Sequence, residues 1–303
     1  MALSASELTE VAPKTPIGCC VVGDYVVANQ SPGGASGLMP NGAFSVMDTN
    51  TETALAYSGL DSSNWQPNTA YAIYAFAMVA GAGYAWAVWP GVTTVSRITV
   101  TTGAITNTTL GSHLGNQQMF ATTAGGYVVA FSGNGSTLRL CQMSTLTASS
   151  VTATHSISQA IASDGTYVYW WSSNTWRRLD PTTGTVTTVG TTGAISAFGR
   201  GVVIDGIVWV RSTTALFAFN PSTGITAMHS HAHLTGGDYA TFTDLVQHSD
   251  GNIYGYGGSD YLIGFNPSNG MFGKESLSPS RSRRYTVASA AGKLWIPSGI
   301  PLT

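Results

Sequence analysis

Short apolar runs separated by turn residues are the dominant pattern of the chain, and three stretches share one turn sequence. They span residues 176–185, 216–225 and 262–271, and each contains Asp-Pro or Asn-Pro, two polar residues and then Gly. In such a turn the Asp or Asn side chain caps the backbone, Pro fixes φ at the second position, and Gly adopts the left-handed conformation. Each stretch therefore predicts two β-strands joined by a tight turn.

A second hairpin signal precedes each of these stretches. Asp-Gly pairs at residues 164–165, 205–206 and 250–251 are each followed by a run of β-branched and aromatic residues. Asp-Gly between apolar strands is a strong short-range signal for a hairpin. The repeating unit is thus four strands in about 40 residues, which is the size of a propeller blade.

We predict an all-β fold, namely a single β-propeller of four-stranded antiparallel blades over residues 17–303. Weaker copies of both hairpins in the first half bring the count to seven blades, with six as the alternative. The last copy runs out of chain before its outer strands. Residues 1–16 are predicted to form an N-terminal arm, in which Leu8–Val11 is the candidate outermost strand of the last blade.

Two of the repeats also carry a family resemblance. Residues 174–186 resemble repeats of the YVTN and quinoprotein-like propeller families, and residues 217–224 resemble a kelch-type blade. The resemblance implies a propeller architecture over nearly the whole chain. The quinone-docking version of these repeats carries a Trp shortly after the Gly, and residues 186–190 contain none, so no organic cofactor is expected.

The composition supports this fold class. Only 9% of the residues are charged, and Gly, with 36 residues, and Thr take their place. Helical bundles and doubly wound α/β enzymes need helices rich in Glu and Lys, so the composition argues against both. A formal net charge of −2 gives no field that would attract nucleic acid.

One apolar segment was tested as a membrane span. Residues 70–88 are mostly apolar, but large and small residues alternate on either side of Gly81-Ala82-Gly83. That period is typical of strands, so two strands joined by a turn are predicted rather than a spanning helix. The three cysteines form neither a disulfide framework nor a zinc pattern. The N-terminus shows no secretory signal pattern.

Histidines at alternate positions provide the sharpest local motif. His229, His231 and His233 would lie on one face of an extended strand, since strand side chains repeat every two residues. Three imidazoles on one face can bind Zn, Ni or Fe, so the motif indicates a possible divalent metal site. The alternative is a polar outer strand and loop whose histidines meet water.

The predicted binding surface lies on the face opposite the stereotyped turns. The connections between second and third strands and between blades belong to that face, and binding residues concentrate in such loops. Aromatic residues there suit sugar stacking, while three arginines suit an anion or a partner. The alternatives are packing between blades and a solvated loop. The candidate binding residues are Trp65, Trp171, Tyr256, Tyr261, Arg281, Arg283 and Arg284.

Two classes of function remain open from the sequence. The favoured one is a non-enzymatic virion protein, a bacteriophage tail or tail-tip component that contacts a cell-surface glycan or other virion proteins. It rests on a charge-poor, Thr- and Gly-rich β chain without a secretory signal, and it places the protein in the virion, with the cytoplasm as the alternative. The other class is a propeller enzyme, a lyase resembling the streptogramin-lyase group or a glycan hydrolase. No catalytic residues are assigned, because most carboxylates have turn roles.

Overall fold

The structure is a computed structural model, and part of the chain is described. The described residues are 8–10, 18–29, 44–57, 77–88, 94–110, 119–132, 136–153, 160–193, 195, 197–212, 215–231, 245–257, 261–276 and 287–296. These residues form β-strands joined by turns, and no helix occurs among them. Within them, accordingly, no helix is long and apolar enough to cross a membrane.

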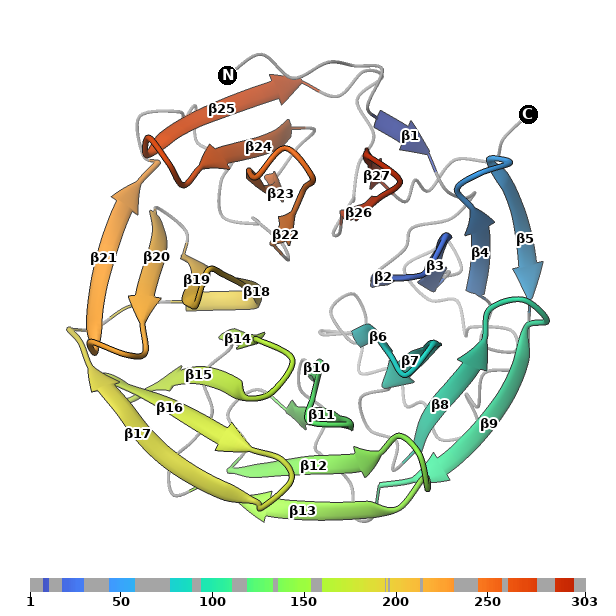
Figure 1. The fold of residues 1–303 in the computed structure, drawn as a ribbon, viewed down its shortest axis with the longest axis horizontal. Helices are drawn as coiled ribbons and strands as arrows, with labels where there is room; N and C mark the ends of the chain where they lie inside the picture. The colour runs from blue at the N-terminus through green and yellow to red at the C-terminus, as the bar shows by residue number, and fades with distance from the viewer. Residues whose placement is uncertain are drawn as a thin grey trace, which may run out of the picture.

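The strands fall into four concentric positions around a ring (Figure 1). The innermost strands are β2 (Cys19–Val22), β6 (Ala77–Gly81), β10 (Met119–Ala124), β14 (Ala160–Ser163), β18 (Ala197–Ile204), β22 (Val246–Gln247) and β26 (Ala288–Ala290). The second strands are β3 (Tyr25–Asn29), β7 (Tyr84–Val88), β11 (Tyr127–Ser132), β15 (Val168–Ser172), β19 (Ile207–Ser212), β23 (Ile253–Gly257) and β27 (Lys293–Ile296). The third strands are β4 (Phe44–Asp48), β8 (Thr94–Thr99), β12 (Thr137–Gln142), β16 (Thr175–Asp180), β20 (Ala215–Asn220) and β24 (Tyr261–Asn266). The outer strands are β5 (Thr53–Tyr57), β9 (Ala104–Thr109), β13 (Ala148–Thr152), β17 (Thr185–Thr191), β21 (Ile225–Ser230) and β25 (Met271–Ser276).

The prediction of an all-β propeller of four-stranded antiparallel blades is confirmed. Within each group, neighbouring strands pair antiparallel in chain order, as in the hairpins of β2, β3, β4 and β5. Two groups share one eight-stranded sheet, because β14 and β18 pair in parallel. β1 (Leu8–Glu10) pairs in parallel with β27, on the side of β27 away from β26. The number of blades stays a prediction, since this last group has three strands among the described residues.

The turns have the predicted geometry. Gly184, Gly224 and Gly270 have φ values of 71°, 73° and 71°, in the left-handed region that favours glycine. Asp180 caps its turn by accepting a hydrogen bond from the backbone N–H of Thr182 at 2.9 Å. The apolar segment around residue 80 forms the predicted hairpin of β6 and β7.

The core lies between neighbouring groups of strands, because each blade buries both faces. Between the blades of β16 and β20, for example, the ring of Trp176 stacks on Phe219 with 4.5 Å between centroids and 4° between planes. Burial of such aromatic faces stabilises the ring, and offset stacking adds about 1 kcal/mol.

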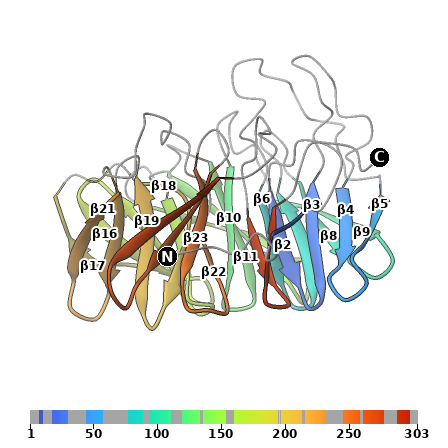
Figure 2. The same ribbon diagram turned by 90° about the horizontal axis from the view of Figure 1, so that it is seen from above.

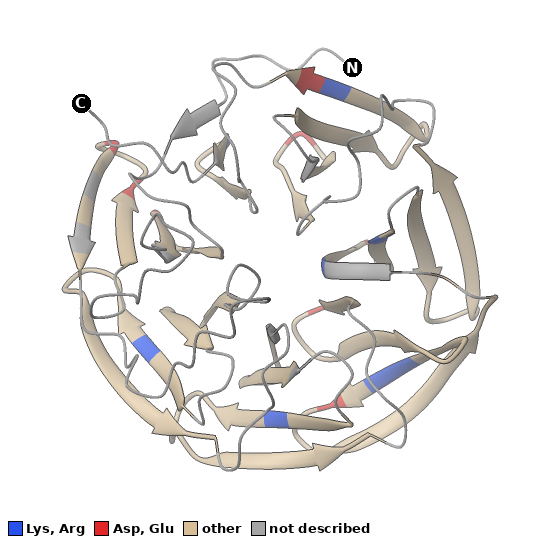
Figure 3. Cartoon of the chain, turned by 180° about the vertical axis from the view of Figure 1, so that it is seen from behind, with Lys and Arg blue, Asp and Glu red and all other residues tan. Residues whose placement is uncertain are grey.

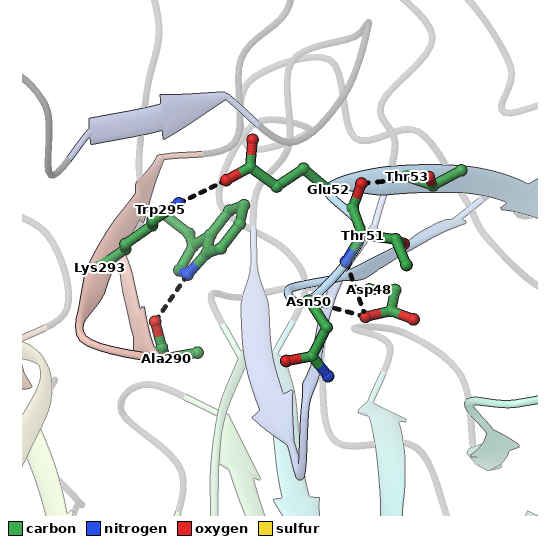
Figure 4. Close-up of polar contacts among 8 residues, drawn as sticks. All are labelled: Asp48, Asn50, Thr51, Glu52, Thr53, Ala290, Lys293 and Trp295. Atoms are coloured by element: carbon green, nitrogen blue, oxygen red, sulfur yellow. Dashed lines mark hydrogen bonds and ion pairs between the residues drawn. The ribbon is translucent and has the colours of Figure 1, made fainter.

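The first and last blades meet in a closure seam. Cys19 of β2 packs with Ala288 of β26 and Trp295 of β27 in one buried cluster. The Trp295 Nε1–H donates to the carbonyl O of Ala290, and Lys293 pairs with Glu52 at the surface (Figure 4). The chain thus closes the ring through apolar burial, with an exposed ion pair at its edge.

The strand directions define two faces of the disc. The turns between first and second strands and between third and fourth strands all lie on one face, at the bottom of Figure 2. We call this the turn face and the opposite side the loop face. Innermost and third strands run from the loop face to the turn face, and second and outer strands run back.

Candidate functional site

One charged side chain lies at the centre of the ring. Arg200 is the only Asp, Glu, Lys or Arg in the innermost strands that the structure describes. It is the fourth residue of β18, in the half of that strand nearer the loop face. The residue as a whole is partly exposed.

The guanidinium of Arg200 spans the centre of the ring. Nη1 donates a hydrogen bond to the carbonyl O of Met78 in β6 at 2.8 Å, and Nη2 donates to the carbonyl O of Cys19 in β2 at 3.2 Å. Both strands lie across the axis from β18 (Figure 1). The two hydrogen bonds therefore fix the orientation of the guanidinium plane.

An irregularity in β18 positions this arginine. The pairing of β18 with β19 shifts register between Phe198 and Val202, so the Gly199-Arg200-Gly201 segment leaves the regular ladder. A Cβ on Gly201 would lie 2.2 Å from the carbonyl O of Trp209. Only glycine allows this close backbone approach, and bulges of this kind commonly redirect a side chain.

The other polar side chains that the structure describes on the innermost strands are uncharged. Ser163 of β14 donates to the carbonyl O of Thr123 at 2.7 Å, and the Thr123 hydroxyl donates to the carbonyl O of Ala80 at 2.8 Å. These hydroxyls tie three innermost strands together. Burial raises the pKa of Cys20 to about 12, reinforced by Cys19 and opposed by Arg200, so this thiol stays protonated and is a poor nucleophile.

The predicted histidine cluster lies at the rim of the ring. His229 and His231 are at the end of the outer strand β21, and they pack against aromatic rings. His229 lies 5.5 Å from Trp209 and 5.1 Å from Phe265, and the fully buried His231 lies 5.6 Å from Phe272. No group of three metal-ligating residues occurs in the described part of the chain. His233 lies outside the described residues, so the metal site stays a prediction.

Another histidine, His248, lies at the turn face. The buried His248 lies 2.9 Å, Nδ1 to Oγ, from Ser289 of β26 and so links the last two groups of strands. Nearby Asp250 accepts hydrogen bonds from the Tyr254 hydroxyl at 2.7 Å and from Asn252. Burial acts to raise the pKa of Asp250, but these hydrogen bonds, with His248, lower it below its ordinary value. The Asp250 carboxylate is thus engaged in its own turn.

The predicted binding residues are spread over several blades. Trp171 is the next-to-last residue of β15, close to the loop face, and its Nε1 is buried without a hydrogen-bond acceptor. Tyr261 begins β24, and the Lys274 ammonium lies 3.6 Å from its ring centroid. Tyr256 lies in β23, but its side chain is not described. Trp65, Arg281, Arg283 and Arg284 fall outside the described residues. The structure does not bring Trp171 and Tyr261 together, and this binding surface stays a prediction.

Comparisons with known proteins show which solved structures have a similar fold. No family model matches the chain, and neither does any curated protein. Among solved structures, a streptogramin B lyase is similar with a TM-score of 0.71 and 12% identity, covering 96% of this chain and 93% of that one. A catalytically inactive virginiamycin B lyase from Staphylococcus aureus, with quinupristin, has a TM-score of 0.72 and 13% identity, covering 99% and 95%. The chain therefore has the architecture of these lyase propellers over nearly its whole length.

This finding corrects the functional prediction from the sequence. A non-enzymatic phage tail or tail-tip protein was expected, and that expectation is wrong, because the similar structures are enzymes. They support the alternative, a propeller enzyme. The error came from composition: few charges and many Thr residues are what any protein of short, tightly turned strands requires, whatever its function.

Proposed function

We propose that this protein is a propeller enzyme of the lyase type, with its site at the loop-face end of the ring axis. The observation that carries the proposal is the likeness to streptogramin B lyase and virginiamycin B lyase over 95–99% of the chain. The position of Arg200 supports it, because it is the one cationic residue in the described innermost strands and it lies in the half of β18 nearer this end.

A lyase breaks a bond by elimination and adds no water. The reaction needs a base that removes a proton and a group that stabilises the negative charge on the departing atom. Arg200 suits the second role, since its planar guanidinium is held in a fixed orientation across the axis. For the first role we select histidines, because a histidine-to-alanine variant of the similar virginiamycin B lyase is described as catalytically inactive.

Three histidines are the candidates for the base. His113, His155 and His233 belong to the connections from β9 to β10, β13 to β14 and β21 to β22. The strand ends that these connections join are at the loop face. His229, His231 and His248 are set aside, because they pack between blades or at the turn face.

The test is a mass balance on one substrate. Purified protein is incubated with quinupristin, and the products are analysed by mass spectrometry. Elimination gives products whose masses sum to that of the substrate, whereas hydrolysis adds one water. We expect the first result, and we expect replacement of one of the three candidate histidines by alanine to abolish it, while His229→Ala keeps it. Unchanged quinupristin, or products heavier by one water, would contradict the proposal.

A further inference from the structure

Carboxylates are concentrated at one face of the disc. Seven of them lie in the hairpin turns, at the turn face, and four of the Asp side chains cap the backbone there. Figure 3 colours Asp and Glu residues red on the ribbon. The seven carboxylates are Asp24, Asp48, Glu52, Asp164, Asp180, Asp205 and Asp250. One cation, Lys293, lies among them and pairs with Glu52. Arg97 and Arg178 lie in the halves of β8 and β16 nearer this face, but the carboxylates outnumber the cations, so the turn side of the described residues is negative.

Arginines are concentrated toward the other face. The strand directions place four of them in the half of the blades nearer the loop face: Arg139, Arg177, Arg200 and Arg211. Two carboxylates, Glu10 and Glu275, lie on the same half, both on strands at the outside of the ring. The segments outside the described residues carry five carboxylates and four basic residues, which nearly cancel.

This separation of charge gives the disc an electric dipole along the ring axis. A carboxylate or phosphate is repelled from the turn face and attracted to the loop face, since the summed field of a protein steers charged ligands over its surface. Arg139, Arg177 and Arg211 lie in three neighbouring blades, on second and third strands. Of the innermost strands that the structure describes, only β18 carries a charged residue, Arg200. The field of the disc and the position of Arg200 thus both favour an anion at the loop-face end of the ring axis.

Arg200 also has the geometry of an anion receptor. A guanidinium matches the two oxygens of a carboxylate or phosphate, and fixing its plane in advance lowers the entropy lost on binding. The carbonyls of Met78 and Cys19 fix that plane from across the ring. Arg97 and Arg178 differ, because they lie nearer the turn face with their guanidinium carbons 4.7 and 4.3 Å from the ring centroids of Tyr84 and Tyr167.

We propose that the loop-face end of the ring axis is an anion site centred on Arg200, which takes a carboxylate or a phosphate group. The inference that the substrate carries such a group rests on the proposed function. The inference that the site binds an anion is tested by binding alone, without any turnover of substrate.

The experiment measures binding of two probes to the purified protein by calorimetry. Inorganic phosphate and malonate are titrated separately at constant ionic strength set with sodium chloride, so that general screening does not change. We expect saturable binding of at least one probe, and the stronger one identifies the group. Arg200→Gln should weaken it by about tenfold or more. Arg178→Gln removes the same charge near the turn face and should leave the affinity within about twofold.

A second variant covers the case in which Arg200→Gln fails to fold. Arg200→Lys keeps the charge but loses the planar fork, so it should bind the probe more weakly than the wild type and more tightly than Arg200→Gln. Three outcomes would overturn the inference: no saturable binding of either probe, equal affinity in Arg200→Lys and the wild type, or an equal loss in Arg178→Gln. Anion binding without turnover of quinupristin would reject the lyase proposal alone, and turnover without anion binding would reject this inference alone.

Discussion

Three glycines near the interface of the β16 and β20 blades separate backbone strain from steric clash. Gly224 has φ +73°, yet a Cβ there would meet nothing closer than 3.6 Å. Gly190 has no positive φ, but its Cβ would lie 2.7 Å from the ring of Phe219. Gly193 has neither problem. Replacing each by alanine therefore isolates one physical effect, with Gly193→Ala as the matched control.

The expected magnitudes follow from these environments. Gly224→Ala should destabilise the fold by about 1 kcal/mol, the cost of a side chain in the left-handed region. Gly190→Ala should cost about 2 kcal/mol, because the buried Phe219 ring is stacked on Trp176 and cannot move aside. Gly193→Ala should be neutral or stabilise by about 0.5 kcal/mol, since it restricts the unfolded chain.

Urea unfolding followed by circular dichroism measures all three differences, with thermal melts as a second readout. In a chain of this size 1 kcal/mol shifts Tm by about 2 °C, so the order of the three melting temperatures is resolved. If Gly224→Ala were as stable as Gly193→Ala, the left-handed turn geometry would be wrong. If Gly190→Ala were as stable as Gly193→Ala, the described packing of Phe219 between the blades would be wrong.

Three further predictions concern a carboxylate, the buried thiols and the closure of the ring. The folded-state pKa of Asp250 is lowered from an unfolded value of about 3.9. The ionised carboxylate therefore stabilises the fold above that pH, and this stabilisation is lost as the pH falls through the folded pKa. The melting temperature of Asp250→Asn should accordingly depend less on pH below about 4 than that of the wild type, and an unchanged pH profile would contradict this. Burial holds the pKa of Cys20 at about 12 and of Cys141 at about 11, so Ellman's reagent should label neither in the native protein at pH 8. Deleting residues 1–16 removes the partner of β27 and should expose Cys19, at the seam, to labelling before Cys141; equal labelling rates would show that β1 does not close the ring.

The sequence predicts the fold well because its signals are local. An Asn-Pro turn, or an Asp-Gly pair between apolar runs, determines a hairpin through residues within a few positions of one another. The repetition of these signals determines the propeller, because a four-stranded blade buries its faces only against other blades. The β6 and β7 hairpin illustrates this, since alternation alone distinguished it from a membrane span.

The candidate site depends on contacts that no local pattern encodes. Arg200 hydrogen-bonds residues 122 and 181 positions away in the sequence, and its own surroundings, Gly-Arg-Gly, resemble an ordinary turn. The histidine motif illustrates a different point, and the metal site that it indicates stays a prediction. Alternation correctly indicated that His229 and His231 share a face, but in a propeller even an outer strand turns one face toward the next blade. The sequence signal that these histidines pack against the next blade was the presence of two aromatic residues, Phe265 and Phe272, in the neighbouring repeat.

The two roles of Arg200 are linked through the closure of the ring. Its hydrogen bonds join β18 to β2 and β6, and β2 lies at the seam, where Cys19 packs against the last blade. A change at Arg200 therefore alters the orientation of the cationic group and the bracing of the seam together. A bound anion would add charge-assisted hydrogen bonds to a guanidinium whose plane the two carbonyls already orient. Ligand binding at the axis should accordingly stabilise the seam, which makes thiol labelling of Cys19 a readout of the site as well as of the fold.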